Sequence, residues 1–508
     1  MPFSIIMIIS LTVFILIVFT ILKSLYSIGP TEVGLIIKRL SFKKLKQDDP
    51  IAYQGEAGYQ AKLLMPGLRF KLWPINTVQK YPWVQVPAGE IGVVISQVGK
   101  SLPVGAKSAI YNKAMGTFTN FDLFLKNGGE KGVQRPVLLP GTLAPMHPVG
   151  FLIITKRRIF GIPVDPKLRA IQNKQTLTCN DFGLKPEQLD IVRIQSGAEN
   201  RDMIGVVTTH DGNPLDAGDI ANRLGGFADI TKMESDSKIL DADLVELILG
   251  SKNHLHNNFQ DFQSFIDNGG RIGLQHDPLL YGSYALNPFL VAVEIVPMLV
   301  VEQGQVAVVK SYVGLVTKDT SGDEFKFGSL VRPGHRGIWQ EPLRTGKYPI
   351  NPRCYQPVIV PTSILTLNWA EATSKAHDLD SQLSQIDAKS KEGFEFAIDL
   401  QVQIHISDTK APKVISMVGT MQNLINEVLQ AAVGNHFRDK LQSMKAIEFI
   451  EHRQQVQEDA FDHISGKLTD YKVETKGVYI QDVVLPGDLV KVLTQREIAS
   501  QEVETFKM

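Results

Sequence analysis

Four copies of one short sequence pattern occupy most of this chain of 508 residues. Each copy opens on an apolar, strand-like run, at Glu32, Glu90, Met203 and Gln305. Each closes on a turn glycine and a later proline: Gly67 and Pro74, Gly141 and Pro148, Gly282 and Pro288, Gly334 and Pro342. The step from glycine to proline is 7, 7, 6 and 8 residues. Such self-similarity predicts small β modules in series rather than one catalytic core.

Length and composition indicate a globular protein of several domains. At about 100–200 residues per domain, a chain of this length is expected to form roughly three to five units. Hydrophobic residues make up 44% and charged residues 21%, which argues against wholesale disorder. The formal net charge of +0 gives no reason to expect nucleic-acid binding. Cys179 and Cys354 are too few for a disulfide framework or a tetrahedral metal site, and fit a reducing cytoplasm.

The N-terminus predicts a membrane anchor. Residues Phe3 to Leu22 carry no charged side chain, and these 20 residues would reach about 30 Å as a helix, the thickness of a bilayer core. A signal peptide is the alternative, but no basic residue precedes the run and Lys23-Ser24-Leu25-Tyr26 is a poor cleavage site. We therefore expect an uncleaved transmembrane helix in residues 1–24.

Basic residues predict the orientation of this anchor. They all follow the apolar run, and they include Lys23, Lys38, Arg39, Lys43, Lys44 and Lys46. Loops rich in lysine and arginine stay in the cytoplasm. The prediction is a single-pass protein of the cell (plasma) membrane, with its N-terminus outside and the bulk of the chain cytoplasmic. A second basic cluster, Lys156-Arg157-Arg158, is interpreted as a solvated strand end, with contact to anionic lipid as the alternative.

Periodicity and turn residues divide the chain into eight predicted segments. The β copies carry insertions, of which 239–249 and 258–267 are predicted helices, the second ended by Asn268-Gly269-Gly270. The predicted segments are a transmembrane anchor (1–24), a first β module (25–86), a second (87–160), a connector (161–200), a third β module with a helical insertion (201–300), a fourth (301–390), an αβ module (391–485) and the start of a C-terminal helix (486–508).

The clearest secondary structure lies near the C-terminus. Residues 394–406 alternate between apolar and polar for thirteen positions, which predicts a strand with one buried face. Helices are predicted over about 420–444 and 446–469, followed by a strand over 478–484 and a last helix. The fold class is therefore α+β: a transmembrane helix, tandem β-rich modules, an αβ module and a C-terminal helix.

Motifs for catalysis or metal binding are weak. His254 and His256 would point apart on either a strand or a helix, so they make a poor metal pair. His210-Asp211-Gly212 reads as a hairpin turn rather than a catalytic pair. Asn268–Gly273 lacks the strand and helix that flank a phosphate loop. We predict no catalytic residue, no cofactor-binding residue and no metal ligand, and hence a protein that is not an enzyme.

The order of these segments resembles the SPFH (band 7) family, which includes stomatins, prohibitins and flotillins. Pro66-Gly67-Leu68-Arg69-Phe70 through Pro74 resembles the family's first β subdomain. The strand 394–406, the two helices and the strand 478–484 resemble its second subdomain. Arg496 and Ala499 fall where the family enters a long coiled coil. The resemblance covers 1–100 and 300–508.

The resemblance implies a membrane-anchored scaffold that organises a membrane microdomain or encloses a membrane partner such as a protease. The implied partners are membrane lipids and further copies of the chain in a homo-oligomeric ring or cage, with no cofactor. Two departures are evident: extra β copies precede the fullest module, and the sequence stops at Met508, about 20 residues into the last helix, so the coiled-coil wall of a cage is in doubt.

Two other classes of function stay open at this point. One is a membrane-anchored hydrolase with a site on loops of the β modules, which would show a cluster of ionisable side chains in one concave pocket. The other is a surface adhesin of repeated β domains, which requires the opposite membrane topology.

Overall fold

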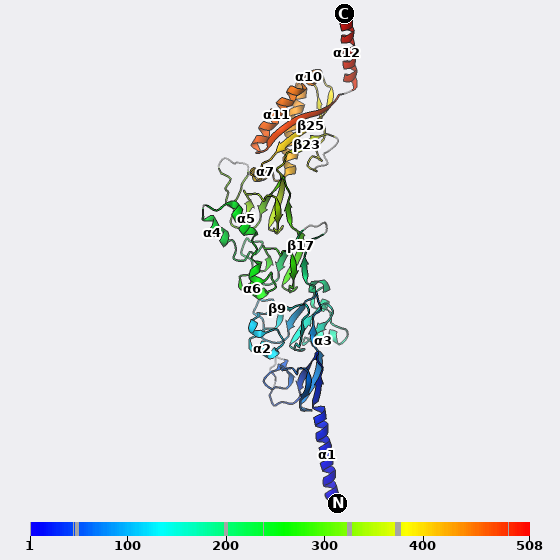
Figure 1. Cartoon of the computed structure of the whole chain (residues 1–508), viewed down its shortest axis with the longest axis vertical. Coiled ribbons are helices and arrows are strands. Elements are labelled where there is room, and N and C mark those ends of the chain that lie inside the picture. Colours follow the sequence, from blue (N-terminus) through cyan, green and yellow to red (C-terminus); the bar gives the residue numbers. More distant parts are fainter. Residues whose placement is uncertain are drawn as a thin grey trace. The chain divides into compact units, whose positions relative to one another are not determined.

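The computed structural model describes residues 2–43, 45, 50–197, 202–236, 238–322, 328–370, 377–485 and 487–507 (Figure 1); the side chains of 2–6, 488, 493, 497, 500 and 502–507 are not described. Lys44 and Lys46 of the orientation argument lie outside the described residues. The chain forms two compact units, one of residues 1–226 and 251–297, the other of residues 227–250 and 298–508. This division cuts through the predicted third module; the segment boundaries drawn from the sequence stay a prediction.

Helix α1 spans Pro2–Lys23, but the predicted transmembrane anchor is not supported. No helix in the described part of the chain is both long and apolar enough to cross a membrane. The single transmembrane helix of the expected fold class is therefore corrected.

Three of the four β copies are built on the same long antiparallel pair. The run that opens the copy pairs over seven residues with the strand that closes it. The pairs are β2 (Glu32–Lys38) with β6 (Asn76–Pro82), β14 (Met203–Thr209) with β17 (Val291–Pro297), and β19 (Gln305–Ser311) with β22 (Tyr355–Pro361). In the second copy β8 (Gly92–Ser96) lies between β9 (Gly132–Leu138) and β11 (Phe151–Ile154), and β12 (Ile159–Phe160) pairs with β11.

A short ribbon precedes each long pair. A lead-in strand pairs with the strand that follows the turn glycine. The ribbons are β1 (Leu25–Ile28) with β5 (Gly67–Phe70), β7 (Val84–Gln85) with β10 (Leu143–Ala144), β13 (Val192–Ile194) with β16 (Gly282–Tyr284), and β18 (Leu299–Val301) with β21 (Gly346–Tyr348). Shorter strands complete the sheets: β3 (Ile51–Ala52), β4 (Gly58–Gln60), β15 (Gly273–Leu274) and β20 (Gly337–Ile338).

The ribbons correct the turn assigned to the fourth copy. The last residue of the lead-in strand faces the turn glycine in the pairs Ile28–Gly67, Ile194–Gly282 and Val301–Gly346. The turn of the fourth copy is thus at Gly346, and its proline is Pro352, six residues on. The sequence misled because Pro333-Gly334 repeats the Pro-Gly dipeptide of the first two copies, whereas Thr345-Gly346 does not.

Gly334 instead occupies the place of Gly129 in the second copy. The backbone N–H of Lys100 donates to the Gly129 carbonyl at 2.9 Å, and the N–H of Leu315 donates to the Gly334 carbonyl at 2.9 Å. Gly129 closes the helix α2 (Phe121–Lys126), and Gly270 closes α6 (Phe262–Asp267) in the same way. Gly334 therefore marks the position where a covering helix ends in the second and third copies.

Helix α6 is shorter than predicted. The expected helix began at 258, but Asn258 and Phe259 have positive φ angles of 55° and 63°. L-residues cannot continue a right-handed helix in that conformation. Asp261 caps the helix by accepting a hydrogen bond from the Ser264 N–H at 3.0 Å, and Phe262 and Phe265 fill the core of the third copy.

The side chain before the closing proline caps the turn in three copies. His147 Nδ1 accepts hydrogen bonds from the N–H groups of Val149 and Gly150 at 3.2 and 2.9 Å. Asn287 and Asn351 accept the corresponding bond from the N–H two residues on, at 3.1 and 2.9 Å. Histidine and asparagine at this position thus both accept hydrogen bonds from backbone N–H groups of the turn.

We expect His147→Asn to remove part of the acid sensitivity of the first unit. Burial lowers the pKa of His147 to about 4, below its unfolded value of 6.5. The neutral ring therefore contributes stability that is fully present above pH 6.5 and is lost as the pH falls to about 4, on the order of 3 kcal/mol. Urea unfolding at pH 7.5 and pH 4.5 should show a smaller stability difference for the variant. An unchanged difference would mean that His147 is not protonated on unfolding.

The predicted connector contains ordered structure. Helix α3 (Pro166–Gln172) follows β12, the last strand of the second copy. Strand β13, at the C-terminal end of the predicted connector, is the lead-in strand of the third copy. The side chains of the basic cluster that precedes the connector contact other side chains of the protein. Lys156 pairs with Asp190 at 2.6 Å, Arg157 with Glu90 at 3.5 Å, and Arg158 lies over the Phe160 ring. This favours the strand-end interpretation over lipid contact.

The C-terminal αβ module confirms the predicted order of elements within the second unit. Strand β25 (Glu395–His405) is central and pairs with β23 (Leu365–Trp369), β24 (Ile386–Lys389) and β26 (Glu474–Val484), all antiparallel. The helices are α7 (Ala411–Val418), α8 (Met421–Asn423), α9 (Gln430–Ser443), α10 (Ala446–Glu451) and α11 (Arg453–Asp470). A π-helical segment over Leu424–Leu429 joins α8 to α9.

The alternating residues of β25 and the residues on one face of the adjacent helix form one core. Every second residue of β25 from Phe396 to Ile404 is buried. Against this face pack Leu429, Val433, Phe437 and Leu441, which recur every four residues and share one side of the helix. Helix α12 (Gly487–Lys507) follows and buries Leu489 in this core. It is a single helix, and the coiled coil stays a prediction.

Candidate functional site

The histidines considered as metal ligands do not form a pair. His254 is exposed, whereas His256 is buried and its Nδ1 accepts a hydrogen bond from the Phe259 N–H at 2.8 Å. Burial lowers the pKa of His256 to about 4, so this ring is neutral near pH 7. Across the described residues, no group of three or more His, Cys, Asp or Glu side chains could hold a metal ion.

His210 and Asp211 are not joined in a catalytic pair. His210 is exposed, while Asp211 is buried and accepts hydrogen bonds from the Ser108 hydroxyl and from the Gly212 N–H. Arg135 donates to the same Ser108 oxygen at 3.0 Å. This network joins the second and third copies inside the first unit, which is a structural role.

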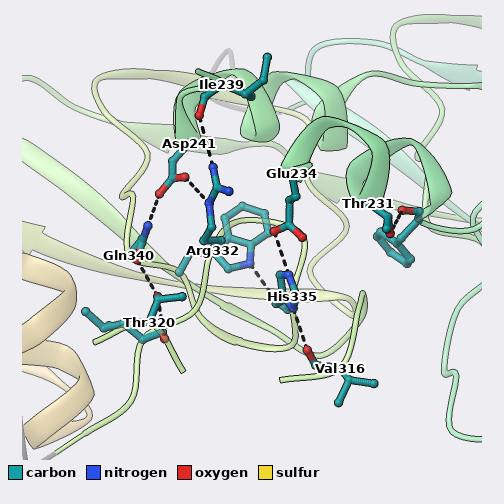
Figure 2. Close-up of polar contacts among 12 residues, drawn as sticks. Thr231, Glu234, Ile239, Asp241, Val316, Thr320, Arg332, His335 and Gln340 are labelled. Atoms are coloured by element: carbon teal, nitrogen blue, oxygen red, sulfur yellow. Dashed lines mark hydrogen bonds and ion pairs between the residues drawn. The ribbon is translucent and has the colours of Figure 1, made fainter. Parts of the chain in front are cut away.

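The best-defined polar site lies in the second unit, where residues 227–250 pack on the fourth β copy (Figure 2). Helices α4 (Ala228–Glu234) and α5 (Asp241–Leu249) form this segment, which we call the clasp. Although the clasp falls in the third copy by sequence, it belongs to the compact unit that contains the fourth. The predicted helix over 239–249 is confirmed as α5.

Arg332 holds the start of α5. Its Nε donates to Asp241 Oδ1 at 2.9 Å, and its Nη2 donates to the Ile239 carbonyl at 3.3 Å. Gln340 donates to the other carboxylate oxygen of Asp241 and accepts from the Thr320 hydroxyl at 2.7 Å. Figure 2 shows both residues of the fourth copy converging on this one carboxylate. The Asp241 side chain is only 17% exposed, so Arg332 and Gln340 supply hydrogen bonds that water would otherwise make to its carboxylate.

His335 holds the end of α4. Its Nε2 lies 2.9 Å from Glu234 Oε1, and its Nδ1 lies 2.7 Å from the Val316 carbonyl oxygen. These two contacts tie the end of α4 to the loop of the fourth copy that carries Val316. The Trp339 indole N–H donates to the His335 carbonyl at 3.2 Å and fixes the turn that carries the ring.

Apolar side chains complete the clasp. Ile230, Leu244 and Ile248 are at most 1% exposed. A Cβ atom on Gly334 would lie 2.6 Å from Ile230 Cγ2, so only glycine lets α4 approach this closely. In the second and third copies the same contact is made by Phe124 on Gly129 and by Phe265 on Gly270.

The clasp therefore replaces a missing helix. In the second and third copies the covering helix, α2 or α6, comes just before the equivalent glycine. The described residues between Ser311 and Gly334 contain no helix. The fourth copy takes its cover from α4 and α5, about 90 residues earlier in the chain. Sequence reasoning missed Glu234, Asp241, Arg332 and His335; the available signal was the absence of a helix before Gly334.

Two further polar clusters lie in the second unit. A hollow of about 210 Å³ beside the clasp is lined by Glu234, Arg332 and His335, together with Thr231, Ser235, Lys318 and Thr320. At the base of β26, hydrogen bonds from Lys410, Lys476 and His405 lower the pKa of Glu474 to about 2. Both clusters consist of charges that bind one another.

Strand β26 forms an edge of the αβ sheet. In the described part of the chain it pairs with β25 alone. Helix α11 covers one point of its outer edge: the Ile480 N–H donates to Gln457 Oε1 at 3.1 Å, and the Arg453 guanidinium donates to the Ile480 carbonyl. Beyond that point an open groove of about 460 Å³ runs between α11 and Lys476–Tyr479. An unpaired edge of this kind is a surface for lateral contact.

Comparison with known proteins identifies one domain. The family model described as SPFH domain / Band 7 family matches residues 299–506, from the lead-in strand β18 into helix α12. The first 298 residues, including the first copy that also resembled this family, lie outside the matched range. A search of curated proteins found no match to the chain.

Proposed function

We propose, from the match of residues 299–506 to the SPFH domain / Band 7 family, that the protein is an oligomeric scaffold that organises a membrane microdomain or encloses a membrane protein such as a protease. Proteins of this family generally act as scaffolds and typically form oligomers. The specific cargo and the microdomain are the part that we propose.

The observation that carries the proposal is the exposed edge of β26 in the matched domain. Tyr479 is 41% exposed there, and Phe461 of α11 lines the same groove. Identical chains that meet through one edge and one complementary surface form rings when the rotation between them closes. Confinement to a lipid surface raises the effective concentration of the chains and favours such contacts.

We place the scaffold at the cytoplasmic face of the cell membrane. Helix α1 supports lipid association because its described apolar side chains are exposed, from Met7 at 70% to Leu22 at 65%. Exposed apolar surface of this extent marks contact with lipid or another protein. The cytoplasmic side is supported by Cys179 and Cys354, which are free thiols.

The described hollows give little support to the hydrolase alternative. The one of about 580 Å³ beside β24 and β25 is lined by Asp387, Lys389 and Glu395 among apolar residues. The hydrogen bond between Lys389 and Glu395 raises the pKa of the lysine and lowers the pKa of the glutamate, so both stay ionised. No described observation favours hydrolysis as a second candidate.

We expect Tyr479→Asp to weaken assembly, because it places a charge in the groove at the sheet edge. Sedimentation velocity of the detergent-solubilised full-length protein should show a large complex for the natural chain and smaller species for the variant. Tyr281→Asp is the matched control, since Tyr281 is 77% exposed and lies in the third copy. If all three proteins sediment equally as large complexes, the contact between chains does not lie in this groove. A natural chain that sediments as a monomer would contradict the proposed function.

A further inference from the structure

The first β copy departs from the other three at its turn. The residue after the turn glycine is Leu68 in the first copy, and it is Thr142, Ser283 or Lys347 in the others. Leu68 is 70% exposed. At a position where three copies carry a polar residue, the first copy thus presents a large apolar side chain to its surroundings.

The same departure recurs further along this turn. Two residues before the closing proline lie Leu72 and its counterparts Met146, Leu286 and Ile350. Leu72 is 47% exposed, whereas the counterparts are 3%, 3% and 5% exposed. Three residues after the turn glycine, Phe70 is 56% exposed, and the residues at the same step in the other copies are the smaller Ala144, Ala285 and Pro349. Apolar groups that the other copies bury, or replace by smaller ones, are exposed in the first copy.

These side chains continue the apolar surface of helix α1. In the ribbon of β1 and β5, Leu25 faces Phe70 and Ser27 faces Leu68, so Leu25, Leu68 and Phe70 share one face. Leu25 is 41% exposed. The Trp73 ring packs edge-on against Phe19 of α1, with ring centroids 5.7 Å apart, which ties the turn to the helix.

The charge around this surface is positive. Residues 57–89 contain Lys62, Arg69, Lys71 and Lys80 and no aspartate or glutamate, in a chain with a net charge of +0. The Arg69 guanidinium donates to the backbone carbonyls of Met65 and Pro66 at 3.1 and 3.2 Å, and among the described residues no carboxylate forms an ion pair with it. Exposed apolar side chains alternating with cations are the composition of a segment that lies in the interface of an anionic bilayer.

We propose that the turn of the first copy, Met65–Trp73, together with the adjoining end of α1, binds the surface of an anionic lipid bilayer. The apolar side chains of Leu68, Phe70 and Leu72 enter the boundary between headgroups and acyl chains, and Arg69 and Lys71 contact lipid phosphates. This inference names the surface through which the proposed scaffold meets lipid, and in that sense it rests on the proposed function.

Vesicle flotation of the full-length protein tests the inference. Protein in mild detergent is diluted into preformed vesicles of phosphatidylcholine, with or without phosphatidylserine. We expect the natural chain to prefer the anionic vesicles, and Leu68→Ser with Phe70→Ser to lower its affinity for them by roughly tenfold or more. Arg69→Gln with Lys71→Gln should abolish the preference for anionic vesicles. Tyr281→Ser removes an exposed aromatic ring from the third copy and should change nothing.

A second measurement reports the position of the turn directly. An environment-sensitive fluorophore on Leu68→Cys should brighten when anionic vesicles are added, while the same label on Tyr281→Cys should not; the native cysteines are buried. Unchanged flotation of the double serine variant, or no brightening at position 68, would overturn the inference.

The same samples separate this inference from the proposed function. Sedimentation of the double serine variant in detergent should show the large complex unchanged while flotation on anionic vesicles is reduced. A natural chain that binds vesicles through this turn but sediments as a monomer would contradict the scaffold and leave the lipid surface standing. Flotation that is equal on neutral and anionic vesicles would show that the basic residues do not contact lipid.

Discussion

Leu429→Asp is expected to abolish the cooperative unfolding of the αβ module. Leu429 is 0% exposed and packs in the core between the helices and β25. A carboxylate at this place has no described cation beside it, and burying an unpaired charge costs several kcal/mol. Since a domain is stable by only about 5–15 kcal/mol, this single change removes most or all of its stability.

Calorimetry of the full-length variant should show the loss of one thermal transition. The control is Gln430→Asp, which adds the same charge at the next, exposed position of the chain and should leave the transition in place. If Leu429→Asp keeps a native transition, the helix face has been assigned wrongly and the core does not lie where the structure puts it.

Gly334→Ala is expected to release the clasp. Gly334 has a φ of +100°, so any side chain there is strained by about 1 kcal/mol. The added Cβ would also lie 2.6 Å from Ile230 Cγ2, and overpacking of this kind costs about 1–3 kcal/mol more. The two terms together should lower the stability of the second unit by about 2–4 kcal/mol and move α4 away from the fourth copy.

Gly393→Ala separates these two terms. Gly393 has a φ of +89° and nothing within 4 Å of its Cβ position, so alanine there carries only the backbone strain. Limited proteolysis should cut within residues 227–250 faster in Gly334→Ala than in Gly393→Ala or the natural chain. If both alanine variants resist cleavage equally, the clasp does not depend on the close approach at Gly334.

Local periodicity predicted the αβ module well. The alternation over 394–406 became β25, and the helix expected over about 420–444 became the run from α8 to α9. In such segments every residue either enters one core or faces away from it, so a short window of sequence carries the whole signal. The long helix expected over 446–469 is divided at His452 into α10 and α11.

Features set by contacts between distant residues were not predictable in this way. The turn of the fourth copy was placed at Gly334 because a Pro-Gly dipeptide is a strong local signal, whereas the pairing of Val301 with Gly346 is visible only in three dimensions. The clasp was assigned to the third copy for the same reason. Its partners, Asp241 and Arg332, are 91 residues apart in the sequence.

The membrane prediction was wrong for the described part of the chain, in which no helix is long and apolar enough to cross a membrane. The turn at Met65–Trp73 could have been noticed from the sequence, because its apolar and basic residues alternate. That Leu68, Phe70 and Leu72 are exposed, while the counterparts of Leu72 in the other copies are buried, required the structure.

The central claim is that copies of this chain assemble side by side through the SPFH/Band 7 domain. Mass photometry of the full-length protein, extracted in amphiphile and diluted, measures this most directly. We predict a dominant population at a high multiple of the chain mass of 56.3 kDa, with a narrow distribution that indicates a closed assembly. A single population at the mass of one chain plus its amphiphile would contradict the account.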